Sequence, residues 1–425
     1  MSNSRDMAKR ISAFAGLPLL SSLAPFLLLP YIARVGGEGT WNALAVGQAV
    51  GSLAAILVGL GWTLSGPARV AGTSDPELRR RLYAISLMTR LVAFSLCLPV
   101  LAGIAALYGG AGNFWVTFLM AGAQAAAGLS PAWYCIATGE PGKIARYDVL
   151  PRIISTVACI PVLLATGLII LYPAAILAGG LLGTFFFTRR YSKRHDYAQL
   201  HALPVLKEIW ALRAASGTTM AAAAYSATPV LVVAAAALPS GLSVFVSAEK
   251  LFRIGLMAVG ALGSSLQGWV AEIDGDHLKR RKFSLLSHTV LGLAGLAGFT
   301  LLGPWVTQLL FGQPLAADGA TCFWFGLAFL FVSINTSTGS HWLVPAGRIR
   351  AVFWSTVAGA AIGLPAMLFL STFMQGAGGA LGLAIGEFVV CAVQCVALVY
   401  FSRSIRRNAA APAARRESAK SESDS

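Results

Sequence analysis

The sequence predicts an all-α polytopic membrane protein of about twelve transmembrane helices, arranged as two six-helix lobes. The lobes are expected to be related by a pseudo-two-fold axis along the membrane normal and to enclose a central cavity. Three observations support this prediction: the composition, the series of long apolar segments, and the placement of the basic residues. Of 425 residues, 56% are hydrophobic and only 12% are charged, about half the charged fraction of soluble domains. The mean hydropathy is +0.71, so nearly the whole chain is expected within the membrane.

The apolar segments are long enough to cross a bilayer, which takes about 20 residues of helix. They lie at about 12–34, 41–66, 83–108, 114–137, 147–167, 168–188, 212–238, 242–270, 285–311, 319–341, 351–373 and 378–402. The stretch 147–188 is divided at Thr166 and Gly167 because it is too long for one crossing. The basic start of the chain leads into the first segment without a cleavage site of small residues, which is typical of a signal-anchor.

Basic residues lie in every second connection between these segments. They are Arg5, Lys9, Arg10, Arg79, Arg80, Arg81, Lys143, Arg146, Arg189, Arg190, Lys193, Arg194, Lys279, Arg280, Arg281, Lys282, Arg348, Arg350, Arg403, Arg406 and Arg407. The alternate connections, near 35–40, 109–113, 167, 239–241, 312–318 and 374–377, contain no Lys or Arg. Cytoplasmic loops attract basic residues, so both termini are predicted to be cytoplasmic. The net charge of +15 is thus an orientation signal, and no nucleic-acid binding is predicted because no basic surface interleaved with aromatic residues occurs.

This orientation predicts which single cysteines an impermeant thiol reagent reaches in intact cells. With the six native cysteines replaced by alanine, labels at Gly110, Ser240 and Gly376 should react from outside, because these positions lie in the connections without Lys or Arg. Labels at Ser192 and Asp276 should react only after permeabilisation. Reaction at Ser192 in intact cells would reverse the predicted orientation.

An internal repeat predicts two halves of the same orientation. Val70, Ala71, Leu78, Arg80 and Arg81 recur 200 residues later as Val270, Ala271, Leu278, Arg280 and Arg281. Both segments leave the second span of their half, which indicates parallel repeats with a site at their interface. The predicted division is an N-terminal lobe at 1–188, a basic cytoplasmic linker at 189–207, a C-terminal lobe at 208–402 and a disordered cytoplasmic tail at 403–425. Chance similarity of two cytoplasmic loops is the alternative.

Motifs for enzymatic chemistry are missing from the sequence. It contains no phosphate-binding loop of the GxxxxGK[ST] form, no HExxH and no cysteine–histidine cluster. The loops are too short for a catalytic domain, which disfavours a membrane-embedded glycosyltransferase. Asp274 and Asp276 lie in such a loop and are interpreted as part of a solvated linker, not as metal ligands. We therefore expect no enzyme, no resident cofactor and no metal. The six cysteines, all within or beside apolar segments, are interpreted as small apolar residues.

Four stretches resemble the Wzx-type O-antigen and exopolysaccharide flippases of the multidrug/oligosaccharidyl-lipid/polysaccharide exporter superfamily. They are "LPYIARVGGEGTWNALAVGQA" (29–49), "GWTLSGPARVA" (61–71), "SPAWYCIATGE" (130–140) and "SAEKLFRIG" (247–255). Each motif is loose, but their order and spacing over about residues 10–400 are similar to that family. The sequence departs from the family at Ile136, Ala137 and Thr138, where a Gln often precedes the glycine.

The resemblance implies a flippase in the bacterial inner membrane that works by alternating access through a cationic cavity. Its substrate would be an undecaprenyl-diphosphate-linked oligosaccharide, moved from the cytoplasmic to the periplasmic leaflet for assembly of O-antigen or exopolysaccharide. Membrane lipids and a polysaccharide polymerase with its chain-length machinery are the implied partners. Coupling to a proton gradient, a cation gradient or the membrane potential stays open. The alternative within the superfamily is an antiporter of cationic drugs or metabolites.

Charged residues at or near membrane depth are the candidate site, because such residues are costly unless they face a cavity or a partner. The cations are Arg34, Arg69, Arg90, Arg152, Lys250 and Arg253, and the carboxylates are Asp148, Glu249 and Glu387. The excess of cations suits a lipid diphosphate, since guanidinium binds phosphate with paired hydrogen bonds. An antiporter of organic cations would be expected to show the opposite sign.

Several of these residues have a structural alternative. Arg34 and Arg69 lie near span ends, from which their side chains could reach the interface. Arg152 and Asp148 are i,i+4 neighbours that could neutralise each other. Glu387 directly follows Gly386, which has with Gly382 a spacing that is typical of close helix packing. It is either a buried neutral carboxyl or a coupling site.

The charges at 249–253 lead to a specific prediction for each side chain. Glu249 and Arg253 are i,i+4 neighbours and are expected to pair, whereas Lys250 is expected to lie on the next face without that partner. Lys250 is therefore predicted to face the central cavity, together with Arg34, Arg69 and Arg90, and to bind the diphosphate.

Overall fold

The structure of the protein is a computed structural model that describes residues 28–197, 202–213, 216–217, 220, 227–272 and 276–423. Its helices are α2 (Leu29–Gly59), α3 (Trp62–Ala71), α4 (Pro76–Ala125), α5 (Ala132–Ala137), α6 (Pro141–Ile144), α7 (Leu150–Thr166), α8 (Leu171–Tyr191), α9 (Ala202–Ala211), α11 (Pro229–Ala236), α12 (Pro239–Ala271), α13 (His277–Phe311), α14 (Gly319–Ser337) and α15 (Ile349–Ser423). Three short 3₁₀ segments, η1 (Ala126–Leu129), η3 (Arg194–Tyr197) and η4 (Gln313–Leu315), and two π-helical segments, η2 (Ala145–Val149) and η5 (Thr338–Leu343), complete the described elements. No strand occurs in these ranges, and the predicted all-α class is confirmed.

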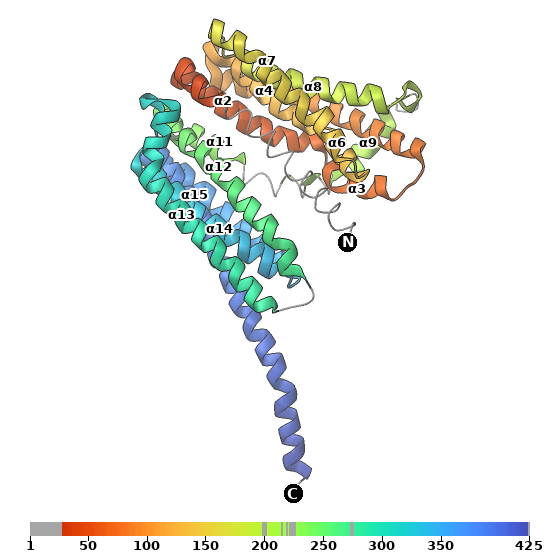
Figure 1. Ribbon diagram of the computed structural model, residues 1–425, viewed down its shortest axis with the longest axis vertical. Helices are drawn as coiled ribbons and strands as arrows, with labels where there is room; N and C mark the ends of the chain where they lie inside the picture. The colour runs from red at the N-terminus through yellow and green to blue at the C-terminus, as the bar shows by residue number, and fades with distance from the viewer. Residues whose placement is uncertain are drawn as a thin grey trace. The chain divides into compact units, whose positions relative to one another are not determined.

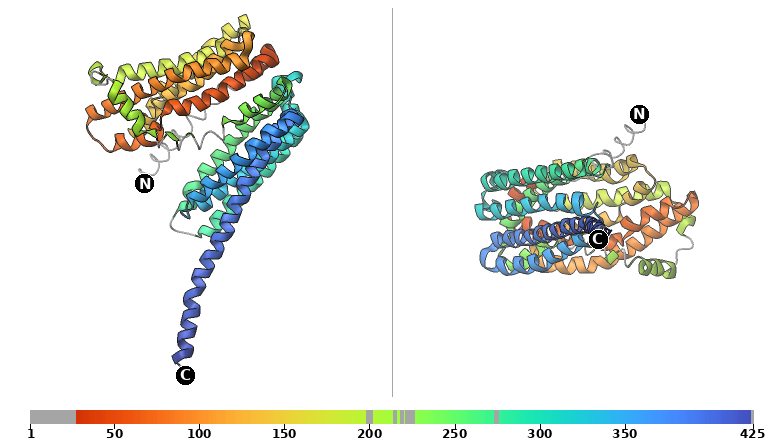
Figure 2. Two further views of the ribbon diagram at one scale, coloured as in Figure 1. Left: turned by 180° about the vertical axis from the view of Figure 1, so that it is seen from behind. Right: turned by 90° about the horizontal axis from the view of Figure 1, so that it is seen from below.

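Three long helices, α2, α4 and α15, each contain a reversal at one residue whose backbone angles are not helical. Figures 1 and 2 show α4 beside α8 and α14 beside α15. The backbone leaves the helical region at Gly37 (φ 65°, ψ −173°) in α2, at Gly110 (φ 56°, ψ −164°) in α4 and at Gln375 (φ 53°, ψ −130°) in α15. Positive φ is costly for residues with a Cβ, which explains glycine at two of these positions. All three fall in connections that the charge pattern predicted.

The helices match the predicted spans once they are divided at these reversals. Seven helical stretches in the described ranges are long and apolar enough to cross a membrane, and two of them, α2 with α3 and α15, contain such a reversal. The predicted break at Thr166 and Gly167 is confirmed: α7 ends at Thr166, and Gly167 has φ 67°. The predicted span 12–34 lies mostly outside the described residues, and the predicted span 212–238 lies partly outside them. The basic residues of the N-terminus and Asp274 also lie outside the described residues.

The chain forms two compact units. Unit 1 comprises residues 1–246 and 307–316, and unit 2 comprises 247–306 and 317–425. Residues 403–423, which composition predicted to be disordered, continue α15 as helix to Ser423. This segment is rich in alanine and contains several Arg, Lys and Glu, all strong helix formers.

Unit 1 is held together by close approach of its helix backbones. A Cβ on Gly51 of α2 would lie 2.3 Å from the carbonyl oxygen of Ala121 in α4. A Cβ on Gly183 of α8 would lie 2.1 Å from the carbonyl oxygen of Tyr147. Small residues permit this approach, and packing of this kind associates helices in lipid. An aromatic cluster around the buried Phe187, with Tyr83, Tyr134 and Tyr147 in ring contact, fills one end of the unit.

Unit 2 contains α12 from residue 247 onward, α13 up to residue 306, α14 and α15. The two halves of α15 pack against each other, because a Cβ on Gly363 would lie 2.7 Å from the Cα of Gly386 and one on Gly382 would lie 2.3 Å from the Cα of Met367. The predicted close-packing role of Gly382 and Gly386 is thus confirmed. Phe252, Phe325 and Phe329 form an aromatic contact between α12 and α14.

Candidate anion-binding site

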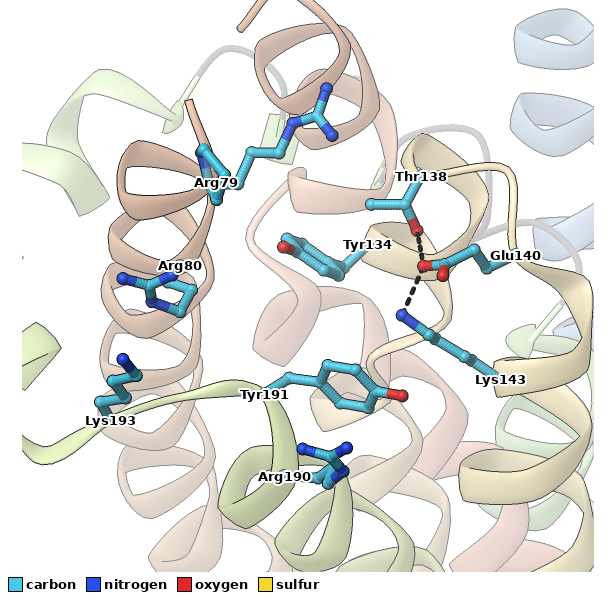
Figure 3. Close-up of a pocket in the computed structure, with 10 residues that line it drawn as sticks. Arg79, Arg80, Tyr134, Thr138, Glu140, Lys143, Arg190, Tyr191 and Lys193 are labelled. Atoms are coloured by element: carbon cyan, nitrogen blue, oxygen red, sulfur yellow. Dashed lines mark hydrogen bonds and ion pairs between the residues drawn. The ribbon is translucent and has the colours of Figure 1, made fainter. Parts of the chain in front are cut away.

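A basic cavity of about 510 Å³ lies in unit 1 and is drawn in Figure 3. It is lined by Pro76, Arg79, Arg80, Tyr134, Thr138, Glu140, Lys143, Arg190, Tyr191 and Lys193. Five of these side chains are cationic and one is a carboxylate. The lining comes from three connections that the charge pattern places on the cytoplasmic side. We refer to this cavity as the basic cavity.

The first wall is the N-terminal turn of α4. Asp75 caps this helix, since its carboxylate accepts a hydrogen bond from the backbone N–H of Glu77 at 2.8 Å. Arg79 Nε donates to the carbonyl oxygen of Thr73 at 2.7 Å, and Arg80 Nε lies 3.6 Å from Asp196 Oδ2. The cap and these two contacts fix both guanidinium groups at the cavity.

The second wall is the connection between α5 and α6. Glu140 Oε2 accepts hydrogen bonds from Lys143 Nζ at 2.6 Å and from Thr138 Oγ1 at 2.8 Å (Figure 3). Partial burial raises the pKa of the Glu140 carboxyl, but the hydrogen bonds from Lys143 and Thr138 and the charge of Lys143 outweigh burial and hold this pKa below its ordinary value. Glu140 therefore stays ionised and compensates Lys143, whose Nζ also lies 4.1 Å from the centre of the Tyr191 ring.

The third wall is the end of α8 and the residues that follow it. Tyr191 is held in place by ring contact with Phe187, with centroids 4.6 Å apart. The backbone N–H of Lys193 donates to Asp196 Oδ2 at 2.7 Å, which fixes the turn after the helix. The Arg190 and Lys193 side chains are exposed and form no ion pair with the described carboxylates. These two cations are available to a ligand.

A second basic cavity of about 510 Å³ adjoins the first through a shared residue. Arg146, Tyr147, Pro151, Phe186, Arg189 and Arg190 line it. Arg190 thus lies at both cavities, and three guanidinium groups surround the second. Together the two cavities give this end of unit 1 a strongly positive field, which attracts anions.

The cations that sequence reasoning selected in unit 1 lie elsewhere in that unit. Arg34 is exposed and donates through Nη2 to the carbonyl oxygen of Leu309. Arg69 pairs with Glu208 and lies over the Trp62 ring, 4.8 Å from its centre. None of these side chains lines the basic cavity, and their predicted role in binding stays a prediction.

Arg90 is the most enclosed of the predicted cations, at 1% exposure. Its guanidinium donates to the carbonyl oxygens of Ser86 at 3.1 Å, Gly128 at 3.1 Å and Ser130 at 2.9 Å. Gly128 and Ser130 lie at the irregular junction between η1 and α5. Their carbonyl groups accept hydrogen bonds from Arg90 in place of a helical partner. Arg90 therefore ties α4 to that junction.

The predicted pair of Arg152 and Asp148 is present, with Nη2 and Oδ1 3.1 Å apart. Asp148 lies in the π-helical segment η2, one turn before Arg152. In unit 2, Asn335 Nδ2 donates to Glu387 Oε2 at 3.1 Å and to the Glu387 carbonyl oxygen, also at 3.1 Å. Both carboxylates thus have polar partners on neighbouring turns or helices.

The charged group on α12 differs from the prediction at one residue. Arg253 donates to Glu249 as expected. The expectation that Lys250 lacks this carboxylate is wrong, because Lys250 Nζ lies 3.5 Å from Glu249 Oε2. A lysine side chain is long enough to bend back along the helix toward its neighbour, which spacing on a helical wheel does not capture. Glu249 and Lys250 are 4% and 5% exposed, so the two cations share one buried carboxylate.

Sequence reasoning treated the residues of the basic cavity only as an orientation signal. The sequence contained a signal for this cavity that was missed. Three connections of the N-terminal half, all predicted to lie on the cytoplasmic side, carry its cations: Arg79 and Arg80, Lys143, and Arg190 and Lys193. Within the described residues, no group of three or more His, Cys, Asp or Glu side chains lies close enough to hold a metal ion.

No protein-family model and no curated protein sequence matches the chain. Solved structures do match over nearly the full length. An inward-facing multidrug-resistance MATE family transporter of the MOP superfamily is 17% identical, with 91% of this chain and 95% of that chain covered and a TM-score of 0.67. The lipid II flippase MurJ in an inward closed conformation is 12% identical, with 90% and 87% covered and a TM-score of 0.67. The chain therefore has the fold that these two structures share.

A third match has a further relevant description. A MOP superfamily transporter from Pyrococcus furiosus Vc1 (DSM3638), described as having a binding pocket of reverse polarity, is 15% identical, with 93% and 95% covered and a TM-score of 0.52. These matches cover 90% or more of the chain and agree with the predicted architecture of about twelve helices. They also show that this fold occurs in both drug transporters and a lipid flippase.

Proposed function

We propose that the protein is a flippase for undecaprenyl-diphosphate-linked oligosaccharides and that the basic cavity receives the diphosphate on the cytoplasmic side. The observation that carries the proposal is the charge of this cavity. Among the described residues, Lys143 is the one cation of the lining that pairs with Glu140. Of the other four cations, Arg80 alone pairs with a described carboxylate outside the lining. A diphosphate that links a lipid to a sugar carries about two negative charges and about four non-bridging acceptor oxygens, which the paired N–H donors of guanidinium groups match.

The position of the cavity also supports this substrate. Its walls are the ends of helices α4 and α8 and the start of α6, so it lies at the border between apolar spans and the aqueous side. A lipid-linked substrate presents its diphosphate at the same border. Tyr134 and Tyr191 add hydroxyl groups and apolar ring surface beside the cations (Figure 3). The flippase among the structural matches moves a lipid substrate, which is consistent with this assignment.

An antiporter of cationic drugs or metabolites is the second candidate, and the MATE family match favours it. A binding site for an organic cation needs a carboxylate that is free to face the ligand. Glu140 is engaged by Lys143 and Glu249 by two cations, which weakens this candidate. The excess of cations favours the anionic substrate.

The test is flipping of a fluorescent polyprenyl-diphosphate oligosaccharide by the purified chain in proteoliposomes. The double variant Arg190→Ala with Lys193→Ala should reduce the initial rate about tenfold or more, because two charge-assisted hydrogen bonds to phosphate are lost. Arg194→Ala is the matched control, since Arg194 is an exposed cation of the same connection that lines neither cavity. The control should flip at nearly the wild-type rate.

Glu140→Gln should act in the opposite direction. The substitution removes the one negative charge of the lining and frees Lys143 for the ligand, so the diphosphate lipid should bind several-fold more tightly. The apparent affinity for the fluorescent lipid measures this change. If wild-type protein flips no lipid diphosphate but exchanges organic cations for protons, the antiporter replaces the flippase.

A further inference from the structure

Unit 2 contains two buried histidines that neither the sequence nor the basic cavity accounts for. His288 on α13 is 0% exposed and His341 in η5 is 1% exposed, and their ring centroids lie 5.5 Å apart. His341 lies in a π-helical turn, a distortion that costs stability and is frequent at functional sites. Histidine is the residue whose charge changes most readily near neutral pH.

The carbonyl partners decide which ring nitrogens carry hydrogen. His288 Nδ1 lies 2.9 Å from the carbonyl oxygen of Ser284, and His341 Nε2 lies 3.1 Å from that of Gly263. A carbonyl oxygen only accepts, so both nitrogens are N–H donors. The remaining nitrogens, His288 Nε2 and His341 Nδ1, are therefore the basic ones in the neutral rings.

His341 Nδ1 lies at the end of a chain of hydroxyl groups. Ser284 Oγ is 2.6 Å from His341 Nδ1 and 2.9 Å from Ser337 Oγ, and both serines are 0% exposed. Hydroxyl groups donate and accept, so such a chain can reverse direction. A carbonyl or amide group at the position of Ser284 could not reverse the direction of its hydrogen bonds in this way.

His288 Nε2 is buried and has no hydrogen-bond partner among the described residues. It faces Gly263, where a Cβ would lie 3.8 Å from this nitrogen. A proton bound there would find no acceptor in the described part of unit 2. Two imidazolium ions at 5.5 Å also repel each other, so the pair takes one proton and His341 is the better acceptor.

The surroundings of the pair are neutral on every packed element. α12 presents the Gly263 carbonyl, α13 presents Ser284 and His288, and α14 with η5 presents Ser333, Ser337 and His341. On α15, Gln394 Nε2 donates to Ser355 Oγ, and Gln394 Oε1 accepts a hydrogen bond from Thr338 Oγ1. Arg281 and Lys282 precede Ser284 by about one turn, and no described Asp, Glu, Lys or Arg side chain bonds either ring.

We infer that His341, with the Ser284–Ser337 hydroxyl chain and His288 beside it, is a proton-binding site of unit 2 that couples transport to the proton gradient. In the neutral state Ser337 O–H donates to Ser284 Oγ and Ser284 O–H donates to His341 Nδ1. On uptake of one proton from water, Nδ1–H donates to Ser284 Oγ and Ser284 O–H donates to Ser337 Oγ. The Ser337 O–H then no longer donates to Ser284 and turns away from it. The new Nδ1–H is the one covalent bond formed, and release returns the proton to water.

Proton uptake by the purified full chain tests the site without any transport. His341→Gln keeps an N–H near the position of Nε2 for the Gly263 carbonyl and removes the basic nitrogen. Between pH 8 and pH 5 the wild type should take up about one proton more per molecule than this variant. Ser333→Ala is the matched control, because Ser333 is equally buried and donates to the His288 carbonyl oxygen at 2.6 Å outside the hydroxyl chain. It should take up as many protons as the wild type.

A second measurement does not depend on the folding of a variant at the site. In a chain whose other histidines, His195, His201 and His277, are replaced by asparagine, ¹⁵N resonances should show one buried ring become doubly protonated in this pH range. Two rings that stay neutral down to pH 5, or equal uptake by wild type and His341→Gln, would overturn the site.

The role of His341 in coupling rests on the proposed flippase function. The following experiment separates failure of the coupling from failure of the proposed function. A pH gradient across proteoliposomes should change the flipping rate several-fold for wild type and Ser333→Ala and not for His341→Gln. An equal response of all three would overturn the coupling. A one-proton difference in a chain that flips no lipid diphosphate would overturn the substrate and leave the proton site intact.

Discussion

Arg90→Met should lower the free energy of unfolding by about 3 kcal/mol, because it removes three hydrogen bonds and leaves the Gly128 and Ser130 carbonyl groups unpaired in a buried region. Methionine keeps most of the side-chain volume, so loss of packing contributes little. The measurement is the midpoint of thermal unfolding of the purified chain in detergent, which should fall by several degrees.

Arg81→Met is the control for the loss of one positive charge. Arg81 is on the same helix, with its guanidinium 3.0 Å from Glu77 in an exposed i,i+4 pair, and such pairs contribute only about 0.5 kcal/mol or less. If Arg90→Met unfolds at the wild-type temperature but no longer flips substrate, Arg90 is the substrate-binding residue that the sequence predicted and not a structural one.

Gly363→Leu should cost roughly 3 kcal/mol, the upper end of overpacking penalties. The new side chain would begin 2.7 Å from the Cα of Gly386, and backbone on the facing half of α15 cannot move aside as a flexible side chain can. The expected result is a low yield of monodisperse protein and a lower midpoint of thermal unfolding.

Gly298→Leu in α13 makes the same chemical change in the same unit. A Cβ at Gly298 meets no atom within 4 Å, so this variant should unfold close to the wild-type temperature. A stable Gly363→Leu protein would mean that the halves of α15 are not in backbone contact.

Spans, turns and close packing could be predicted from the sequence because each depends on local properties. Apolar length predicted the spans, the absence of Lys and Arg predicted the reversals at Gly37, Gly110 and Gln375, and the spacing of Gly382 and Gly386 predicted a close helix contact. These patterns act over one helix or one turn, so a single sequence contains them.

The candidate site could not be predicted in the same way because it depends on contacts between distant segments. Arg79, Lys143 and Arg190 follow one another at separations of 64 and 47 residues in the sequence. Only the packing of α4, α6 and α8 places them around one cavity. The depth of Arg90 predicted a ligand contact, but the sequence did not predict that Nε and Nη1 donate to three backbone carbonyl oxygens; its role in binding stays a prediction. The bend of Lys250 toward Glu249 is likewise a side-chain conformation that residue spacing does not determine.

The single-residue reversals have a mechanical consequence for each unit. The turn at Gly110 or Gln375 consists of one non-helical residue. So short a connection allows the two helices that it joins very little sliding along each other. In α15, interlocked glycines add a second constraint on the same pair. We expect such a hairpin to move as one rigid body, so that displacement of one end tilts the other end. A small chemical change near the ends that are predicted to be cytoplasmic, such as the arrival of a ligand or a proton, should therefore displace the opposite ends of the same hairpins.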